Sequence, residues 1–500
     1  MSRKNGGGGR AVRLRLTPLE DRTLPAGSLA TSLSSGILRI TDYKSADTLV
    51  VRQTPTGVAV DSTDTHQSFD AVSRVMVDVR NDDTVTNNVS GLGTIRPREV
   101  YLSRRDPTGT KFVSSGDILP GATSGPVIVT QPGDPGGPST GTDWFDKSLS
   151  DAGLRSLART VSGDHSLDRL DVLALFAQAA KDGIVSANEI HDLKTLEKPD
   201  WTAGGALPQQ SALFSMPDSV RALTSDVVDG DPANAHYQGS TLGNLQAGWT
   251  AAQFQKLVNK WFLGLDHPAA EGGATYQKAA GSLFVGGPAL TDVRQGNLGD
   301  CYFLAALGSL TKSQPSALSS MFTDNGDGTF TVRYFNAGVA KYVTVDRMLP
   351  TNSYGKLVYD DAGASVGDST NELWVPLAEK AYAQMNEDGW LGHAASNSYG
   401  AIENGFSDDS LKQVANVTAL WTQMIRATPA QLLTAVGANK PAILNSLTSP
   451  GNGVIGNHTY PVVGYDAATQ RFNLSNPQGG FIQLTWTQIT QSFSGFWAVQ

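Results

Sequence analysis

The chain contains one cysteine, Cys301, in 500 residues. No disulfide can form within it, so its domains must be stabilised by their cores alone. Long apolar runs are missing as well. No segment reaches the 18 or so apolar residues of a membrane-spanning helix, and we therefore expect no transmembrane segment.

The N-terminus has little that would direct the chain to a compartment. Its first 30 residues lack the apolar stretch of a conventional signal peptide. The segment Leu16–Pro25, however, is similar to a short N-terminal motif of many large exported bacterial proteins. The sequence therefore leaves two locations open, the cytoplasm and the exported or cell-surface compartment of a bacterium.

Basic residues are too few for a nucleic-acid surface. The chain has 38 Lys and Arg against 47 Asp and Glu, which gives a formal net charge of −9. Nucleic-acid binding needs clustered positive charge. The one dense basic stretch, from Arg3 to Arg15, contains four consecutive glycines and is typical of a flexible tail. We expect no nucleic-acid partner.

The length and the uneven use of glycine and proline indicate several domains. At roughly 100–200 residues per domain, 500 residues predict two to four units. The expected organisation is a disordered tail (1–30), a small β-rich module (31–103), a Gly/Pro-rich linker (104–142), a helical region (143–265) and a C-terminal domain (266–500).

Short β-branched runs predict the strands of the N-terminal module. The runs are Ile37–Ile40, Leu49–Arg52, Val58–Val60 and Val75–Val79. Turn residues separate them at a spacing of about ten residues, which suits a small sandwich or a few coils of a β-solenoid. The pattern is also similar to calcium-binding β-roll repeats, but most of the glycines and aspartates of such repeats are missing. A purely structural module is favoured.

Two segments have the outline of a calcium loop without its ligands. In Lys181–Glu189, Gly183 and Glu189 fit positions 6 and 12 of an EF-hand loop, but positions 1 and 3 carry no carboxylate. This segment predicts a helix–turn–helix of EF-hand shape without bound metal. Asp324–Thr329 lacks a glutamate at the twelfth position and is followed at once by strand residues, so it predicts a hairpin turn.

Cys301 lies where a reactive thiol is expected. Gln295–Asp300 is a glycine-containing loop, and the apolar run from Cys301 to Leu310 favours a buried helix. Cys301 then occupies the first helical turn. Free N–H groups and the positive end of the helix dipole stabilise a thiolate there.

A base and an orienting group follow in the order of papain-type enzymes. His458 lies in a β-rich stretch, and Asn476 lies 18 residues later at the end of the next expected strand. Two adjacent strands would set the imidazole beside the amide, and the order Cys, His, Asn is that of papain-like proteases. The amide of Gln295 would share an oxyanion hole with the backbone N–H of Cys301.

Five segments in the same order resemble the calpain family of cysteine proteases. Three of them are Gln295–Cys301, Tyr342–Pro350 and Asn371–Tyr382, and the other two surround His458 and Asn476. The resemblance implies an α+β, two-lobed papain-like core, with a helical first lobe and a β-rich second lobe. It also implies limited proteolysis of protein and peptide substrates through an acyl-enzyme.

Two residues depart from the family pattern. Tyr302 follows the cysteine where the family usually has tryptophan, and Gln478 replaces the tryptophan that shields the His–Asn hydrogen bond. The second change favours an alternative, a catalytically weak or inactive calpain-like binding or surface module. Acyl transfer on the same fold is a further alternative, although no acceptor site is legible. His393 matches no family role, so it is interpreted as a surface or cleft-wall residue.

The resemblance implies no cofactor for the chemistry but points to calcium. The family's first-lobe calcium ligands correspond to the backbone carbonyls of Val285 and Gly287 and the carboxylates of Asp292 and Glu372. Alternatively, Asp292 orients the loop before Gln295 and Glu372 caps a helix. Whether calcium is required, and which oligomeric state the chain adopts, cannot be read from the sequence.

Overall fold

The computed structural model describes residues 143–199, 213–361 and 365–499, together with the backbone of nine strands between Leu29 and Ser114. The chain divides into two compact units, Met1–Pro138 and Ser139–Gln500. The expected linker from 115 to 142 and the Leu16–Pro25 motif lie outside the described residues. Most of the expected tail (1–30) also lies outside the described residues; only its last two positions belong to the first strand, which begins at Leu29. In the described part, no helix is long and apolar enough to cross a membrane.

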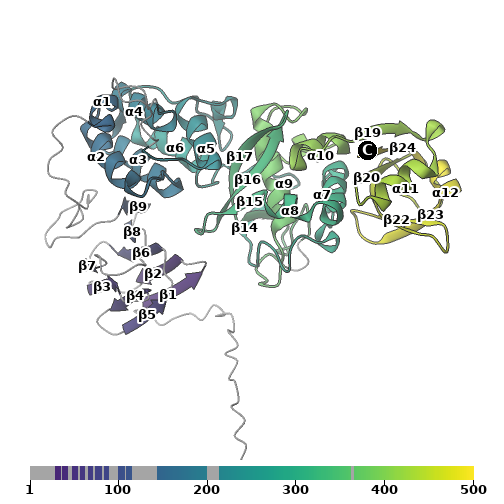
Figure 1. Ribbon diagram of the computed structural model, residues 1–500, viewed down its shortest axis with the longest axis horizontal. Coiled ribbons are helices and arrows are strands. Elements are labelled where there is room, and N and C mark those ends of the chain that lie inside the picture. Colours follow the sequence, from purple (N-terminus) through teal and green to yellow (C-terminus); the bar gives the residue numbers. More distant parts are fainter. Residues whose placement is uncertain are drawn as a thin grey trace, which may run out of the picture. The chain divides into compact units, whose positions relative to one another are not determined.

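The first unit consists of two sheets, drawn in purple in Figure 1. The strands expected from the four β-branched runs correspond to β2, β3, β4 and β6. The sheet orders are β1-β2-β6-β8-β9 and β5-β4-β3-β7, with parallel pairs β2/β6, β6/β8 and β3/β7. The strands are β1 (Leu29–Ser34), β2 (Ile37–Asp42), β3 (Thr48–Gln53), β4 (Gly57–Asp61), β5 (His66–Asp70), β6 (Arg74–Arg80), β7 (Thr84–Asn88), β8 (Val100–Asp106) and β9 (Gly109–Ser114).

The strands continue past residue 103, into the segment expected to be linker. Strands β8 and β9 pair antiparallel, with Asp106 opposite Gly109. Charged residues at positions 104–106 hide the alternating pattern of β8, and this is why sequence reasoning ended the module too early. The strands of each parallel pair are not consecutive in the chain, because at least one other strand lies between them. Hairpins join consecutive strands antiparallel, whereas the coils of a β-solenoid pair in parallel.

The second unit begins with a helical region whose core is separate from the rest. Its apolar side chains form one buried cluster that includes Trp144, Phe176, Phe254 and Phe262. Asp or Ser/Thr caps begin most of these helices, as helix N-termini prefer. The helices are α1 (Trp144–Ser148), α2 (Ala152–Val161), α3 (Arg169–Ala179), α4 (Ala187–Glu197), α5 (Asp218–Val228) and α6 (Ala251–Trp261).

The EF-hand outline is present, and the structure pairs it with a second one. Strand β10 (Ile184–Val185), in the turn between α3 and α4, pairs antiparallel with β13 (Trp249–Thr250), which leads into α6. Glu189 closes a capping box with Ser186, and its Oε2 accepts from the Ser186 N–H at 2.7 Å. In the described segments, no group of three or more His, Cys, Asp or Glu could hold a metal ion.

The next part of the second unit surrounds helix α7, which is buried from Tyr302 to Thr311, and the fully enclosed helix α9. A three-stranded sheet, β15-β16-β17, packs with α10 around them, and every residue of α9 is buried. The elements of this part are β14 (Thr275–Lys278), α7 (Cys301–Ser313), α8 (Pro315–Ser319), β15 (Phe322–Asp324), β16 (Thr329–Asn336), β17 (Val339–Asp346), β18 (Met348–Thr351), α9 (Trp374–Met385) and α10 (Ser407–Ala415).

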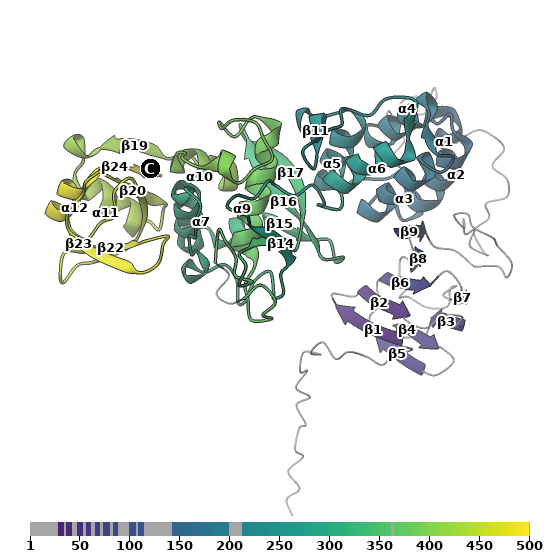
Figure 2. The ribbon, with the colours of Figure 1, turned by 180° about the vertical axis from the view of Figure 1, so that it is seen from behind.

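The last part is a six-stranded sheet with its own buried cluster. The strand order is β19-β24-β20-β21-β22-β23, and α7 lies between this sheet and the three-stranded one (Figures 1 and 2). The chain is therefore α+β here. The elements are β19 (Leu420–Gln423), α11 (Pro429–Gly437), β20 (Ala442–Ser446), β21 (Thr459–Asp466), β22 (Arg471–Ser475), β23 (Phe481–Thr485), α12 (Trp486–Ser492) and β24 (Phe493–Ala498).

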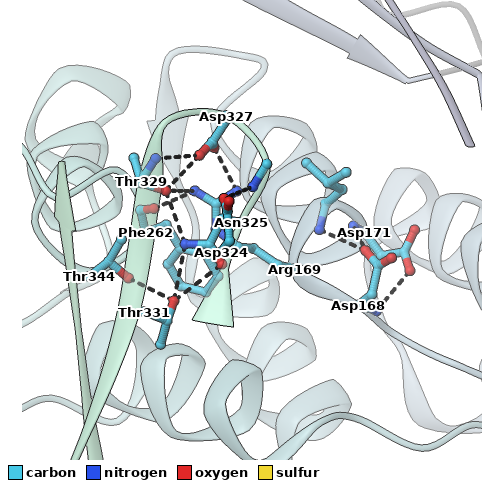
Figure 3. A network of polar contacts seen from close by, with 12 residues as sticks. Asp168, Arg169, Asp171, Phe262, Asp324, Asn325, Asp327, Thr329, Thr331 and Thr344 are labelled. Atoms are coloured by element: carbon cyan, nitrogen blue, oxygen red, sulfur yellow. Dashed lines mark hydrogen bonds and ion pairs between the residues drawn. The ribbon is translucent and has the colours of Figure 1, made fainter. Parts of the chain in front are cut away.

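Charged side chains join the helical region to the three-stranded sheet. The β15–β16 turn is the hairpin expected at Asp324–Thr329. Figure 3 shows Arg169 reaching from α3 into this turn, where Nη1 donates to Asp327 at 2.8 Å. Lys260 of α6 is buried between Asp266 and Glu387, with Nζ at 2.5 Å from each carboxylate. The boundary expected at residue 265 is therefore crossed by buried ion pairs.

Candidate active site

Cys301 is the first residue of α7, as the sequence predicts. The carbonyl of Asp300 accepts the N–H groups of Phe303 and Leu304, at 2.8 and 3.1 Å, and this closes the first turn. No side chain caps the helix. The thiol is half-buried at the end of a helix whose remaining residues are enclosed by the core.

His458 and Asn476 are hydrogen-bonded, as expected from adjacent strands. His458 directly precedes β21, Asn476 directly follows β22, and these strands pair antiparallel. Imidazole Nε2 lies 2.8 Å from Asn476 Oδ1. An amide oxygen only accepts, so Nε2 carries the hydrogen and Nδ1 keeps a lone pair that can accept a proton.

Two hydroxyl groups that sequence reasoning missed fix the histidine. Thr459 Oγ1 donates to the carbonyl of Cys301 at 2.7 Å, which ties the start of β21 to the start of α7. Ser446 Oγ accepts the His458 N–H at 2.8 Å. Single Ser and Thr residues in a strand carry no recognisable signal, so only the pairing of the strands reveals these roles.

Gln295 lies beside both halves of the site. Its backbone N–H donates to the carbonyl of Pro477, the neighbour of Asn476, at 2.7 Å. Its side-chain Nε2 donates to the Leu298 carbonyl at 2.6 Å. An amide nitrogen has two hydrogens. The second faces Asp300 Oδ1 at 3.5 Å, a long contact that the oxyanion role expected from the sequence would replace.

Burial moves the thiol and the imidazole toward their neutral forms. It raises the pKa of the Cys301 thiol, and hydrogen bonds from Thr459 act against this rise. It lowers the pKa of the His458 imidazole, against the effect of Asn476. The helix N-terminus alone would lower the pKa of the thiol by stabilising the thiolate. The pKa is raised instead, because the half-buried thiolate would lose its hydration. A thiolate here needs the imidazole to accept its proton.

The Gln478 side chain is exposed, while His458 is buried and Asn476 half-buried. The Gln478 backbone N–H donates to Asn476 Oδ1 at 3.0 Å. Asn476 Oδ1 therefore accepts two hydrogen bonds. The amide is held in place, but the side chain at 478 does not cover it.

Tyr302 gives His393 a partner within the core. The Tyr302 hydroxyl donates to the Ile402 carbonyl at 2.8 Å and lies 2.9 Å from His393 Nε2. Because its hydrogen is already used, the hydroxyl accepts from Nε2–H. His393 thus supports the residue next to the nucleophile, a role that its sequence context did not indicate.

The four residues expected to bind calcium meet around one loop. Glu372 Oε1 accepts the Val285 N–H at 2.8 Å. Asp292 Oδ2 accepts the Ala289 N–H at 2.7 Å and Trp374 Nε1–H at 2.8 Å, which is the loop-orienting alternative. Burial raises the pKa of Glu372, and the Asp292 carboxylate adds to the rise. The Asp292 carboxylate acts on Glu372, and a cation between them would relieve this repulsion, so the residues fit a calcium ion.

Comparison with known proteins finds similarity to one family over the segment that contains this site. A family model described as calpain family cysteine protease matches residues 274–498. The calpain-type cysteine protease DEK1 of Arabidopsis thaliana is 30% identical over 200 residues, 36% of this chain and 8% of that protein. The human calpain-2 catalytic subunit is 36% identical over 131 residues, and mouse calpain-8 is 35% identical over 131 residues. Each of these two alignments covers 25% of this chain and 17% of the relative. The chain thus spans less than a fifth of the length of these relatives.

Proposed function

Because residues 274–498 are a calpain family cysteine protease domain, we propose that this chain is a cysteine endopeptidase that cleaves protein substrates at a few sites. Cys301 is the nucleophile, His458 the base and Asn476 the residue that orients the base. The observation that carries the proposal is the 2.8 Å contact between His458 Nε2 and Asn476 Oδ1, beside the strand that Thr459 ties to Cys301.

The proposed reaction uses the lone pair on His458 Nδ1 and the sulfur of Cys301. His458 Nδ1 takes the thiol proton, and the Cys301 sulfur attacks the carbonyl carbon of the scissile peptide. The negative charge that develops on the carbonyl oxygen is stabilised by the Cys301 N–H and the remaining Gln295 amide hydrogen. The imidazolium then protonates the leaving amine, the C–N bond breaks, and a thioester remains. His458 next removes a proton from water, and hydrolysis of the thioester restores the thiol.

Calcium is proposed as a structural ion rather than a reactant. The carboxylates of Asp292 and Glu372, with the carbonyls of Val285 and Gly287, would hold it. Bound there, it would supply positive charge to two close carboxylates and fix the loop that leads into Gln295. Every bond-making step above belongs to the chain's own residues.

The proposal is tested by the rate of Cys301 alkylation with iodoacetamide across pH. We expect the wild-type thiol to react well below its ordinary pKa of about 8.5, because the imidazole accepts its proton. His458→Ala should move the reaction to the range of an isolated thiol. His191→Ala, at an exposed position of α4, is the matched control and should change nothing.

A wild-type thiol that titrates like the His458→Ala variant would contradict the protease. The same protein should also be labelled by an epoxide peptide inhibitor and should cut an unfolded protein such as casein. The exposed position of Gln478 favours one alternative, a non-catalytic binding module on the calpain fold. Loss of both labelling and cleavage, with the fold intact, would establish that alternative.

A further inference from the structure

Three carboxyl side chains lie together in the core behind Cys301. Asp300 precedes α7, Asp360 follows β18, and Glu379 lies in the middle of α9. Their exposed fractions are 0%, 1% and 2%. Acidic side chains are almost never buried this deeply without a partner. The reaction proposed above uses none of the three.

Hydrogen bonds account for only one oxygen of each carboxyl. The Arg294 N–H donates to Asp360 Oδ1 at 2.9 Å, and the Asp360 N–H donates to Glu379 Oε2 at 3.1 Å. Gln295 Nε2 lies 3.5 Å from Asp300 Oδ1. The second oxygen of each carboxyl is buried with no hydrogen-bond donor among the described residues. The Asp300 and Glu379 side chains are within hydrogen-bonding reach of each other.

Among the described residues no cation forms an ion pair with the cluster, although the Arg294 charge acts on Asp360 and lowers its pKa. Lys380, the neighbour of Glu379, points to Asp346 instead, with Nζ 2.5 Å from Oδ1. The Arg294 side chain donates to the Thr291 carbonyl and lies at the exposed surface. The other groups that act on Asp300 and Glu379 are the Glu403 carboxyl and the Tyr302, Tyr334, Tyr382 and Tyr399 phenols, all of them acids.

Protons must therefore take the place of a cation. Burial raises the pKa of Asp300 to about 7 and the pKa values of Asp360 and Glu379 well above their usual range. A protonated carboxyl donates one O–H, which satisfies an oxygen of its neighbour that otherwise has no donor. In the part of the chain that the structure describes, three buried carboxyl oxygens have no hydrogen-bond donor, and no ion pair neutralises the cluster. Both observations indicate that at least one proton is shared within this cluster near neutral pH.

We propose that Asp300 is a positioning residue of the active site, which acts through a proton that it shares with Glu379. The proton lies between the two carboxyls and is released to solvent as pH rises. Asp300 precedes the nucleophile by one residue and contacts Gln295. While the pair holds its proton, a single negative charge is spread over both carboxyls, and its effect on the Cys301 thiolate is reduced. Once Asp300 is ionised, its charge opposes the thiolate. This inference rests on the protease proposed above and names a residue that sets its pH range.

The inference is tested by iodoacetamide alkylation of Cys301 in the full chain across pH. Asp300→Asn removes the charge but keeps the shape. The midpoint of the alkylation profile should therefore move about half a pH unit lower, which is about threefold in rate at a pH below that midpoint. Glu379→Gln supplies an amide donor that stabilises ionised Asp300, so it should slow alkylation by a similar factor. Asp368→Asn, at a surface position of the same domain, is the control and should match the wild type.

Opposite signs for the two substitutions are the result that supports the shared proton. Shifts of the same sign would mean general damage to the site, and no shift would mean that the cluster does not act on the thiol; either would overturn the inference. The thiol is read without substrate, so failure here is distinct from failure of the protease, which His458→Ala reports. If neither variant folds, infrared spectra of the wild type decide. A protonated carboxyl band that disappears near neutral pH supports the inference, and its absence contradicts it.

Discussion

Asn476 holds the imidazole proposed as the base, and it is itself half-buried beside an exposed residue. Its Oδ1 accepts from His458 Nε2 and from the Gln478 N–H, while the side chain at 478 is exposed. A hydrogen bond that competes with water contributes less than the same bond in a dry site. The hydrogen bond between His458 and Asn476 is formed, but position 478 has no large apolar side chain to shield it.

Gln478→Trp should therefore increase activity. An indole over the pair would exclude water and strengthen the His458–Asn476 bond by about 1 kcal/mol, or roughly fivefold in kcat/KM. The measurement is peptide hydrolysis by the two proteins at equal active-site titre. In an Asn476→Ala background the same tryptophan should bring no gain, because the bond that it covers is gone. A gain that persists without Asn476 would show that the indole acts on substrate binding instead.

At the scale of an element, the loop from Val285 to Asp292 links a surface site to Gln295. Gly286 and Gly287 have positive φ values of 81° and 101°, which a side chain would oppose. The loop can therefore fold back so that the Val285 N–H meets Glu372. An ion bound there would order the segment that enters the active site.

We expect calcium to raise the melting temperature of the chain and magnesium to have little effect, since magnesium gives up its water ligands reluctantly. Asp292→Asn and Glu372→Gln should each weaken the calcium response. Asp368→Asn, outside the loop, is the matched control. Equal responses in all four proteins would place any calcium effect elsewhere in the chain.

Local signals predicted the elements that carry the chemistry. The apolar run after Cys301 predicted α7, and the two β-rich segments predicted that His458 and Asn476 would lie on adjacent strands; both are confirmed. Glu379 shows what local signals cannot reveal. A Glu-Lys pair in a helix is usually exposed, yet α9 is covered on every face. The carboxyl cluster joins three distant segments, so no spacing in the sequence indicates it.

At the scale of the second unit, the helical region and the protease domain share buried charge. Lys260 is 1% exposed and lies between Asp266 and Glu387, the latter in the short 3-10 helix Asn386–Asp388. Removal of one member of a buried ion group leaves the others uncompensated, and this costs more than the group contributes when intact. The two regions therefore depend on each other for stability.

Lys260→Met should destabilise the chain by about 3 kcal/mol at neutral pH. The loss should shrink in acid, because protonation of Asp266 and Glu387 removes the uncompensated charge; burial already raises the pKa of Glu387. Urea unfolding at two pH values measures both effects. Lys147→Met, at an exposed lysine of α1 in the helical region, is the control. A loss that is the same at both pH values would show that packing, and not charge, causes it.

The strand order of the six-stranded sheet has a consequence for a chain that is still being synthesised. Strand β24, Phe493–Ala498, lies between β19 and β20, although both precede it by many residues. A ribosome therefore exposes the nucleophile, the base and Asn476 before the middle of their sheet exists. Until residue 498 has emerged, the strand that carries His458 has an incomplete sheet beneath it. The order of the strands therefore makes completion of the sheet beside His458 one of the last events of folding.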